Sequence, residues 1–286
     1  MEARVAILIP AFQAQSTISE TLSSIPDLDW VQVIVVDDGS SEPLQVSHSF
    51  DQAQFDLFRN PENQGVNSTM LQASMQMQDS VEYLIELDAD DQLVPGAIEK
   101  MVSLLDSNPC LDLAWGDLMI KGDQDYVRCY GTYFDPWLTR LKNPISCSTM
   151  MRRTSWVAAG GSWGNNRLQH QDWYMWLSFA RLNAKGGHIG QPALIYNMGA
   201  TGLHRSRKHL TGERRALTLA EFTDLKPWKM FWRSACPWSL RLALLLATII
   251  PVGDFRRARL KSAVLALLWA KDVASFKGRM REFWAG

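Results

Sequence analysis

The first 106 residues alternate between short apolar runs and amphipathic segments, and this alternation constrains the fold more than any other feature. The apolar runs are continuous, as in strands that are buried on both faces of a parallel sheet; they cover residues 5–9, 31–36, 55–58 and 83–87. Helical spacing of apolar side chains predicts helices between them, over about 17–25, 66–77 and 95–105. Strands that alternate with helices predict an α/β fold with a doubly wound, mostly parallel sheet.

Local signals refine some of these boundaries. Pro10 is expected to end the first strand, Thr17-Ile18-Ser19-Glu20 has the form of a helix capping box, and Pro95 suits the start of a helix. Beyond residue 109 the pattern loosens: 113–120 predicts a strand, and 121–150 predicts a smaller, partly antiparallel region. A further helix is expected from Trp173 onward, because apolar residues recur there at helical spacing.

Acidic residues follow two of the predicted strands. Asp37-Asp38 ends one, and Asp88-Ala89-Asp90-Asp91 ends another. The carboxyl ends of parallel strands meet at one edge of the sheet, where ligands collect, so these carboxylates are expected to converge. Crowded carboxylates repel one another, and a divalent hard cation with oxygen ligands offsets that repulsion. An isolated D-x-D-D is also typical of a solvated turn, so the interpretation depends on the motifs around it.

Five motifs, in order, resemble the family 2 glycosyltransferases of the GT-A fold, over about residues 5 to 205. They are Ile9-Pro10-Ala11-Phe12, Val35-Val36-Asp37-Asp38-Gly39-Ser40, Asn63-Gln64-Gly65, Leu87-Asp88-Ala89-Asp90-Asp91, and Ala159-Gly160-Gly161 followed by Gln171-Asp172-Trp173. The resemblance implies a nucleotide-sugar donor, a divalent metal (Mn²⁺ or Mg²⁺) on its diphosphate, and single-displacement transfer to a hydroxyl with inversion. A metal at this place would neutralise the leaving diphosphate.

The resemblance also implies roles for individual residues. Asp90 would hold the metal, and Asp88 would reach the ribose or share the metal. Asp38 would accept a hydrogen bond from the base, for which uracil is the commonest partner in the family. The nucleotide side of the site is therefore assigned to Pro10, Phe12, Asp38, Gly65 and Asp88, and the acceptor side to Asp91, Gln171 and Trp173.

Asp172 occupies the family's position for the general base that takes the proton of the acceptor hydroxyl. An Asp just before an amphipathic helix is also an ordinary N-cap. The Gly-Gly motif before it and Trp173 after it favour the catalytic role, and the two roles are compatible. With Asp172 excluded by experiment, Asp91 would be the next candidate base.

The chain departs from the family pattern in three places. Gln171 stands where Glu is common, Thr69-Met70-Leu71 where Ala-Arg-Asn is usual, and Asn197-Met198-Gly199 where many members have Arg-x-His. His204, in the basic loop that follows, is the nearest candidate for a second metal ligand. A histidine in such a loop is also often a solvated surface residue.

The C-terminal segment 226–286 differs in composition from the rest. It holds 12 Lys/Arg against 3 Asp/Glu, a net charge of +9, whereas residues 1–225 carry −10. We therefore predict a glycosyltransferase domain over 1–225 and a basic, tryptophan-rich helical extension over 226–286. Tryptophan and cations beside apolar helices fit an anionic membrane surface, but packing on the domain or on another subunit is the alternative. The apolar content disfavours nucleic-acid binding.

No membrane-spanning segment is expected, because the longest apolar run, 242–252, is shorter than the roughly 18 to 20 residues required. The apolar run after Met1 is too short for a signal peptide. Cysteines 110, 129, 147 and 236 show neither a disulfide pattern nor a zinc spacing, which favours a cytoplasmic protein. If the C-terminal segment binds a membrane, the protein would be peripheral on its inner face.

These observations predict an inverting, metal-dependent glycosyltransferase that uses a nucleotide-sugar, with UDP as the favoured nucleotide. Its acceptor is expected to be a glycan or lipid-linked glycan, by analogy with the family. The alternatives are an inactive scaffold of this fold, or a nucleotidyltransferase, although the glycine- and arginine-rich phosphate loop of the latter is missing at residues 10–16. The oligomeric state stays open, with a homodimer among the alternatives.

Overall fold

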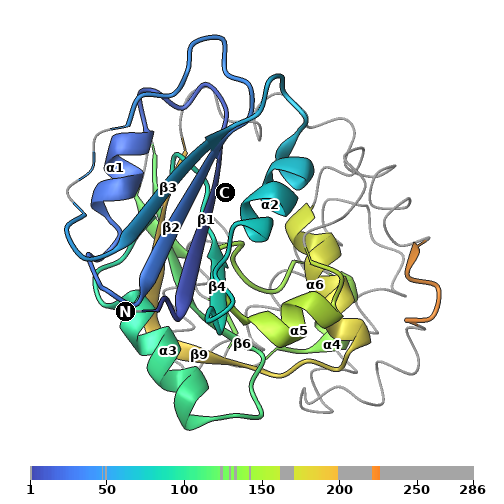
Figure 1. The fold of residues 1–286 in the computed structure, drawn as a ribbon. Coiled ribbons are helices and arrows are strands. Elements are labelled where there is room, and N and C mark those ends of the chain that lie inside the picture. The colour runs from blue at the N-terminus through green and yellow to red at the C-terminus, as the bar shows by residue number, and fades with distance from the viewer. Residues whose placement is uncertain are drawn as a thin grey trace.

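The computed structural model describes residues 2–46, 48, 50–122, 125–128, 130–131, 134–141, 143–161, 171–198 and 221–225. Four strands form its parallel half: β1 (Val5–Ala11), β2 (Val31–Asp37), β3 (Gln54–Arg59) and β4 (Tyr83–Glu86). They lie in the order β3-β2-β1-β4, and every neighbouring pair is parallel (Figure 1). The four strands predicted from the apolar runs are confirmed.

The second half of the sheet mixes directions. It contains β5 (Gln92–Leu93), β6 (Leu113–Lys121), β7 (Tyr126–Arg128), β8 (Met150–Arg152) and β9 (Gly186–Asn197). From β4 the order continues β8-β6-β9-β5, and β7 pairs with β6. Only β6 and β9 run parallel here; β8 is antiparallel to both β4 and β6. The partly antiparallel region after residue 121 is therefore confirmed, whereas β5 and β9 were not predicted.

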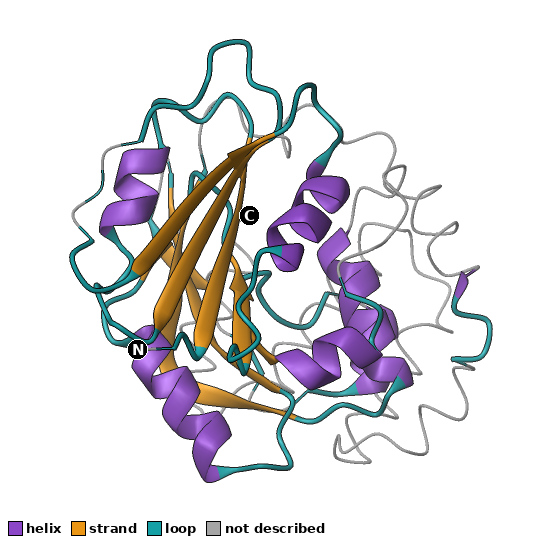
Figure 2. Ribbon diagram, in the orientation of Figure 1, coloured by secondary structure: helices purple, strands orange, loops and turns teal. Residues whose placement is uncertain are grey.

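Helices cover the sheet on both sides (Figures 1 and 2). The described helices are α1 (Ile18–Ser23), α2 (Val66–Met75), α3 (Ala97–Ser107), α4 (Pro136–Leu141), α5 (Arg153–Ala158) and α6 (Gln171–Arg181). Figure 1 shows α1 on one side of the β1–β3 strands and α2 on the other. Helix α2 packs on β1 and β2, α3 packs on β6, β8 and β9, and α4 packs on α6.

Strand β1 runs through Pro10 to Ala11 instead of ending before the proline. The parallel ladder between β1 and β4 reaches only Leu8 opposite Glu86. Alternate residues of a strand direct their backbone groups to the same neighbouring strand, and Leu8 faces β4 because its carbonyl accepts the Leu87 N–H. The N–H that Pro10 lacks would therefore point to the side where β4 has already ended. Proline is tolerated in a strand at such an unpaired position.

Three helix predictions need correction. The capping box is wrong: the Thr17 side chain makes no capping hydrogen bond, and its hydroxyl donates to the Ala14 carbonyl instead. Helix α3 begins at Ala97, after Gly96 in the left-handed region at φ 74°, and not at Pro95. In α2, Met70 and Ala73 are buried as predicted, and so is Met77 just beyond the helix, but Val66 is exposed.

Candidate active site

The D-x-D-D segment forms the turn between β4 and β5, at the carboxyl edge of the parallel strands. The Asp91 N–H donates to the Asp88 carbonyl at 3.1 Å, which closes the turn. The end of β9 fixes it from outside: the Asn197 N–H donates to Asp91 Oδ1 at 3.1 Å, and the Asn197 side-chain amide donates to the Asp90 carbonyl at 2.6 Å. This distant strand therefore sets the conformation of the acidic turn.

The three carboxylates of this turn differ in exposure. Asp91 is fully buried, Asp88 is half-buried and Asp90 is exposed. Burial, and then the charges of Asp88 and Asp90, raise the pKa of Asp91 to about 9. Burial, and then the charges of Asp90 and Asp172, raise the pKa of Asp88 to about 7. The site thus disfavours its own negative charge when no cation is present.

One oxygen of Asp91 lacks a partner. Its Oδ2 atom is buried and accepts no hydrogen bond, although Oδ1 accepts one from Asn197. A buried carboxylate oxygen without a partner is costly unless something binds it. The residues present therefore fit a bound cation.

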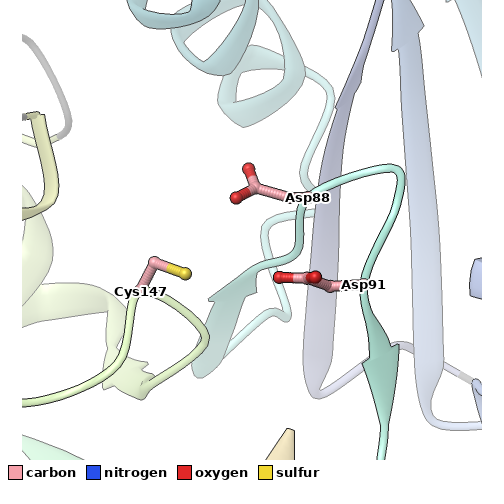
Figure 3. A group of neighbouring side chains, drawn as sticks. All are labelled: Asp88, Asp91 and Cys147. Carbon is pink, nitrogen blue, oxygen red and sulfur yellow. The ribbon is translucent and has the colours of Figure 1, made fainter. Parts of the chain in front are cut away.

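A thiol completes the group that faces this oxygen. Figure 3 shows the side chains of Asp88, Asp91 and Cys147 turned toward a common space. Their potential ligand atoms all lie within 4.8 Å of one another. Cys147 was not predicted from the sequence, because it lies 59 positions from Asp88 and belongs to no recognisable metal-binding spacing. The predicted ligand Asp90 is not part of this group, and His204 lies outside the described residues.

Asp172 lies in the first turn of α6, and not before the helix as an N-cap. Its Oδ1 atom accepts a hydrogen bond from the Trp173 N–H at 2.7 Å, and its Oδ2 atom accepts one from the Asn143 side-chain amide. A carboxylate in the first turn is favourably placed in the field of the helix dipole. The Asp172 charge also contributes to the raised pKa values of Asp88 and Glu86, so the carboxylate acts on the end of β4.

Asp38 is nine-tenths or more buried, and the loop between β3 and α2 surrounds its carboxylate. Oδ1 accepts hydrogen bonds from the Asn60 side chain at 2.8 Å and the Gln64 N–H at 2.9 Å, and Oδ2 accepts one from the Gly65 N–H at 2.9 Å. Gly65 has φ 85° and ψ 155°, a conformation that favours glycine. Asp38 therefore holds the Gly65 loop against the end of β2, and most of its capacity to accept hydrogen bonds is already used.

The preceding residue, Asp37, organises the same turn. Burial alone would raise its pKa, but hydrogen bonds from Ser40 and Leu44 together with the Arg59 charge outweigh burial and lower the pKa. Gly39, at φ 67°, is required here, because a Cβ atom would lie 2.4 Å from the Glu62 backbone carbon. The D-D-G-S segment thus packs directly against the loop that carries Gly65.

The sequence model described as Glycosyl transferase family 2 matches residues 6–175, more than half of the chain. The chain belongs to glycosyl transferase family 2. The chain is similar to an uncharacterized glycosyltransferase of Haemophilus influenzae, with 32% identity in an alignment of 156 residues that covers 51% of this chain and 47% of that protein. The chain thus spans about half the length of this relative.

Solved structures give the fold of this family 2 glycosyltransferase. A crystal structure of S. aureus TarS 1–349 aligns with a TM-score of 0.64 at 14% identity, over 93% of this chain and 81% of that one. The same TarS fragment in complex with UDP-GlcNAc aligns with a TM-score of 0.62 at 13% identity, over 98% of this chain and 80% of that one. The predicted GT-A fold is confirmed. No helix in the described part of the chain is long and apolar enough to cross a membrane.

Four predicted site residues remain, and the structure places three of their side chains. Pro10 and Phe12 lie at the end of β1 beside β2, and the Phe12 side chain is 51% exposed. Trp173, in contrast, is buried, and its indole N–H donates to the Thr139 carbonyl at 2.6 Å. It packs α6 on α4, so its side chain does not offer a surface to an acceptor. The side chain of Gln171 lies outside the described part of the structure.

Proposed function

We propose that this glycosyltransferase transfers a sugar from a UDP-sugar to an acceptor hydroxyl with inversion, and that a divalent metal assists. The observation that carries the proposal is the convergence of Asp88, Asp91 and Asp172 at the carboxyl edge of the sheet, where the charge of Asp172 acts on Asp88 and the charge of Asp88 acts on Asp91. UDP and UDP-GlcNAc are bound in the TarS crystal structures of the same fold, which supports UDP as the nucleotide. Ligands of open α/β sheets bind at this edge.

The nucleotide is proposed to bind over the ends of β1 and β2. The exposed Phe12 ring and Pro10 offer an apolar surface for the base, and the Gly65 loop, fixed by Asp38, forms the adjacent wall. Asp88 is proposed to meet the ribose, as the family pattern implies. Asp38 acts mainly by holding Gly65 in place, and only Oδ2 has capacity for a further hydrogen bond to the base.

The acidic turn would hold the metal. Within this turn Asp90 is exposed, Asp88 is half-buried and Asp91 is buried. A bound divalent cation supplies Lewis-acid neutralisation of the departing nucleoside diphosphate. It would also offset the repulsion that raises the pKa values of Asp88 and Asp91.

Asp172 is the proposed general base. Its two hydrogen bonds, from the Trp173 N–H and from the Asn143 side-chain amide, fix the orientation of the carboxylate. A carboxylate held in a fixed orientation can take the proton of the attacking hydroxyl as the glycosidic bond breaks. Asn143 is therefore a positioning residue for Asp172.

The test is a donor-hydrolysis and transfer screen with UDP-, GDP- and dTDP-sugars, beginning with UDP-GlcNAc, with Mn²⁺, Mg²⁺ or EDTA. We expect nucleotide release from UDP-sugars only, dependent on the cation and lost in Asp172→Asn. Asp79→Asn, which changes an exposed carboxylate at the opposite edge of the sheet before β4, is the matched control and should keep full activity. Equal release with EDTA, or release from GDP-sugars alone, would contradict the proposal.

The acceptor, the membrane contact and the domain division stay proposals that rest on the sequence. A glycan or lipid-linked glycan acceptor follows the family analogy. Peripheral binding to an anionic membrane rests on the +9 charge of residues 226–286, which lie outside the described residues.

A further inference from the structure

Cys147 lies beside the acidic turn because of the strand register. Strand β8 pairs antiparallel with β4, with Leu84 opposite Met151. Continuing this register along both segments brings residue 147 opposite residue 88. The thiol therefore reaches the acidic turn from the antiparallel half of the sheet, whereas both carboxylates come from the parallel half (Figure 3).

The spacing of these three side chains suits a shared ion. Their potential ligand atoms lie within 4.8 Å of one another. Metal–oxygen and metal–thiolate bonds are about 2.0–2.3 Å long, so donors that bind the same ion lie within about 4.6 Å of one another. A small side-chain rotation is sufficient to bring all three donors into bonding distance.

The buried oxygen of Asp91 supplies an independent indication of a ligand. Asp91 is 0% exposed, its Oδ2 atom has no hydrogen-bond partner, and the carboxylate is directed toward Cys147 in Figure 3. Among the described residues, no Lys, Arg or His forms an ion pair with Asp88 or Asp91. A buried carboxylate is normally paired or bound to a metal, so a cation is the partner that this arrangement lacks.

The thiol determines which cation fits. Cys147 Sγ makes a long contact of 3.9 Å with the Ser148 hydroxyl, which leaves the sulfur able to bind an ion. Mg²⁺ and Ca²⁺ take oxygen ligands, whereas thiolate favours softer ions such as Zn²⁺ and Co²⁺. A site with one thiolate and two carboxylates therefore favours borderline-soft cations.

We propose that Asp88, Asp91 and Cys147 form a mixed carboxylate–thiolate site for a borderline-soft divalent cation such as Zn²⁺ or Co²⁺. The proposal rests on the proposed function where it shares Asp88 and Asp91 with the acidic turn that would hold the metal there. It adds a ligand that the acidic motif does not contain. It also makes this glycosyltransferase selective for softer ions over Mg²⁺ at this position.

The experiment uses the full chain, stripped of metal and free of nucleotide, titrated with Co²⁺. Thiolate bound to Co²⁺ gives a charge-transfer absorption in the near ultraviolet, which oxygen ligands do not give. We expect a saturable band with one Co²⁺ per chain, undiminished by excess Mg²⁺. Cys147→Ser should abolish the band, and Asp91→Asn should weaken Co²⁺ binding at least about tenfold. Cys110→Ser, at an exposed cysteine, is the matched control and should keep the band.

A second measurement keeps the test decisive if a variant misfolds. Alkylation of Cys147 in the unmodified chain, mapped by mass spectrometry, should be slowed by Zn²⁺ but not by Mg²⁺. Absence of the band, its persistence in Cys147→Ser, or equal protection by both ions would overturn the proposal. UDP binding, measured in parallel in the presence of Mn²⁺, separates the two proposals. If UDP binds but the cobalt band is absent, the mixed site is wrong and the proposed function stands. If the band is present but UDP does not bind, the mixed site stands and the proposed function is wrong.

Discussion

Glu86 is the last residue of β4, and its carboxyl is buried beside the active site. The side chain is 5% exposed, and its Oε1 atom has no hydrogen-bond partner. Burial, and then the charges of Asp88 and Asp172, raise its pKa from 4.5 to about 8. A hydrogen bond from Trp156 lowers the pKa but does not outweigh them. Without a bound cation, Glu86 is therefore neutral in the folded protein at pH 7.

The sign of the pH dependence follows from this difference. The folded state keeps a proton that the unfolded state releases above pH 4.5. The contribution of Glu86 to stability is therefore fully present below pH 4.5 and is lost as the pH rises toward 8. The loss is at most about 1.4 kcal/mol per pH unit, or about 2–3 kcal/mol between pH 5 and pH 7. Glu86→Gln cannot ionise and should lack this component of the slope.

The assay is urea denaturation in EDTA at several pH values between 5 and 8, followed by tryptophan fluorescence. The unfolding free energy of Glu86→Gln relative to the parent should rise by about 2–3 kcal/mol from pH 5 to pH 7. Glu99→Gln, which removes an exposed carboxyl of α3, is the control and should run parallel to the parent. Parallel curves for Glu86→Gln as well would mean that Glu86 is ionised in the folded protein, and the reasoning would be refuted.

Three further predictions concern the site and the tail. Asp172→Asn should keep the melting temperature and UDP affinity, because an amide oxygen still accepts the Trp173 N–H, but should lower the transfer rate by roughly 10²–10⁴; a near-parental rate would remove Asp172 from the chemistry. Asp38→Ala should lower the unfolding free energy in urea by roughly 1.5–3 kcal/mol and weaken UDP binding in calorimetry, since Gly65 loses its anchor; unchanged stability with lost binding would indicate a direct base contact instead. The full chain should sediment with anionic vesicles, and less of it should do so as the salt concentration rises. Deleting residues 226–286 should abolish this sedimentation, and a truncated chain that still sediments would favour packing of the tail.

The parallel half of the sheet, and the edge at which the site lies, follow from the order of the amino acids alone. Strands β1 and β2 are buried on both faces, so their residues are almost all apolar, and such runs are visible without any knowledge of neighbours. The acidic residues follow those runs directly, so their convergence at one edge follows from local order. The family resemblance rested on the same contiguous motifs, and the match over residues 6–175 confirms it.

Which side chains meet depends on the three-dimensional packing of the strands and helices. Cys147 joins Asp88 through the β4–β8 register, and Asn197 fixes the acidic turn from β9; neither contact leaves a local pattern in the sequence. Whether a carboxylate is exposed, as in Asp90, or buried, as in Asp91, depends on the packing of distant strands. Trp173 and Asp38 were assigned to ligands by position in a motif, but the structure gives their polar groups protein partners, because hydrogen bonding in a folded chain is set by three-dimensional proximity.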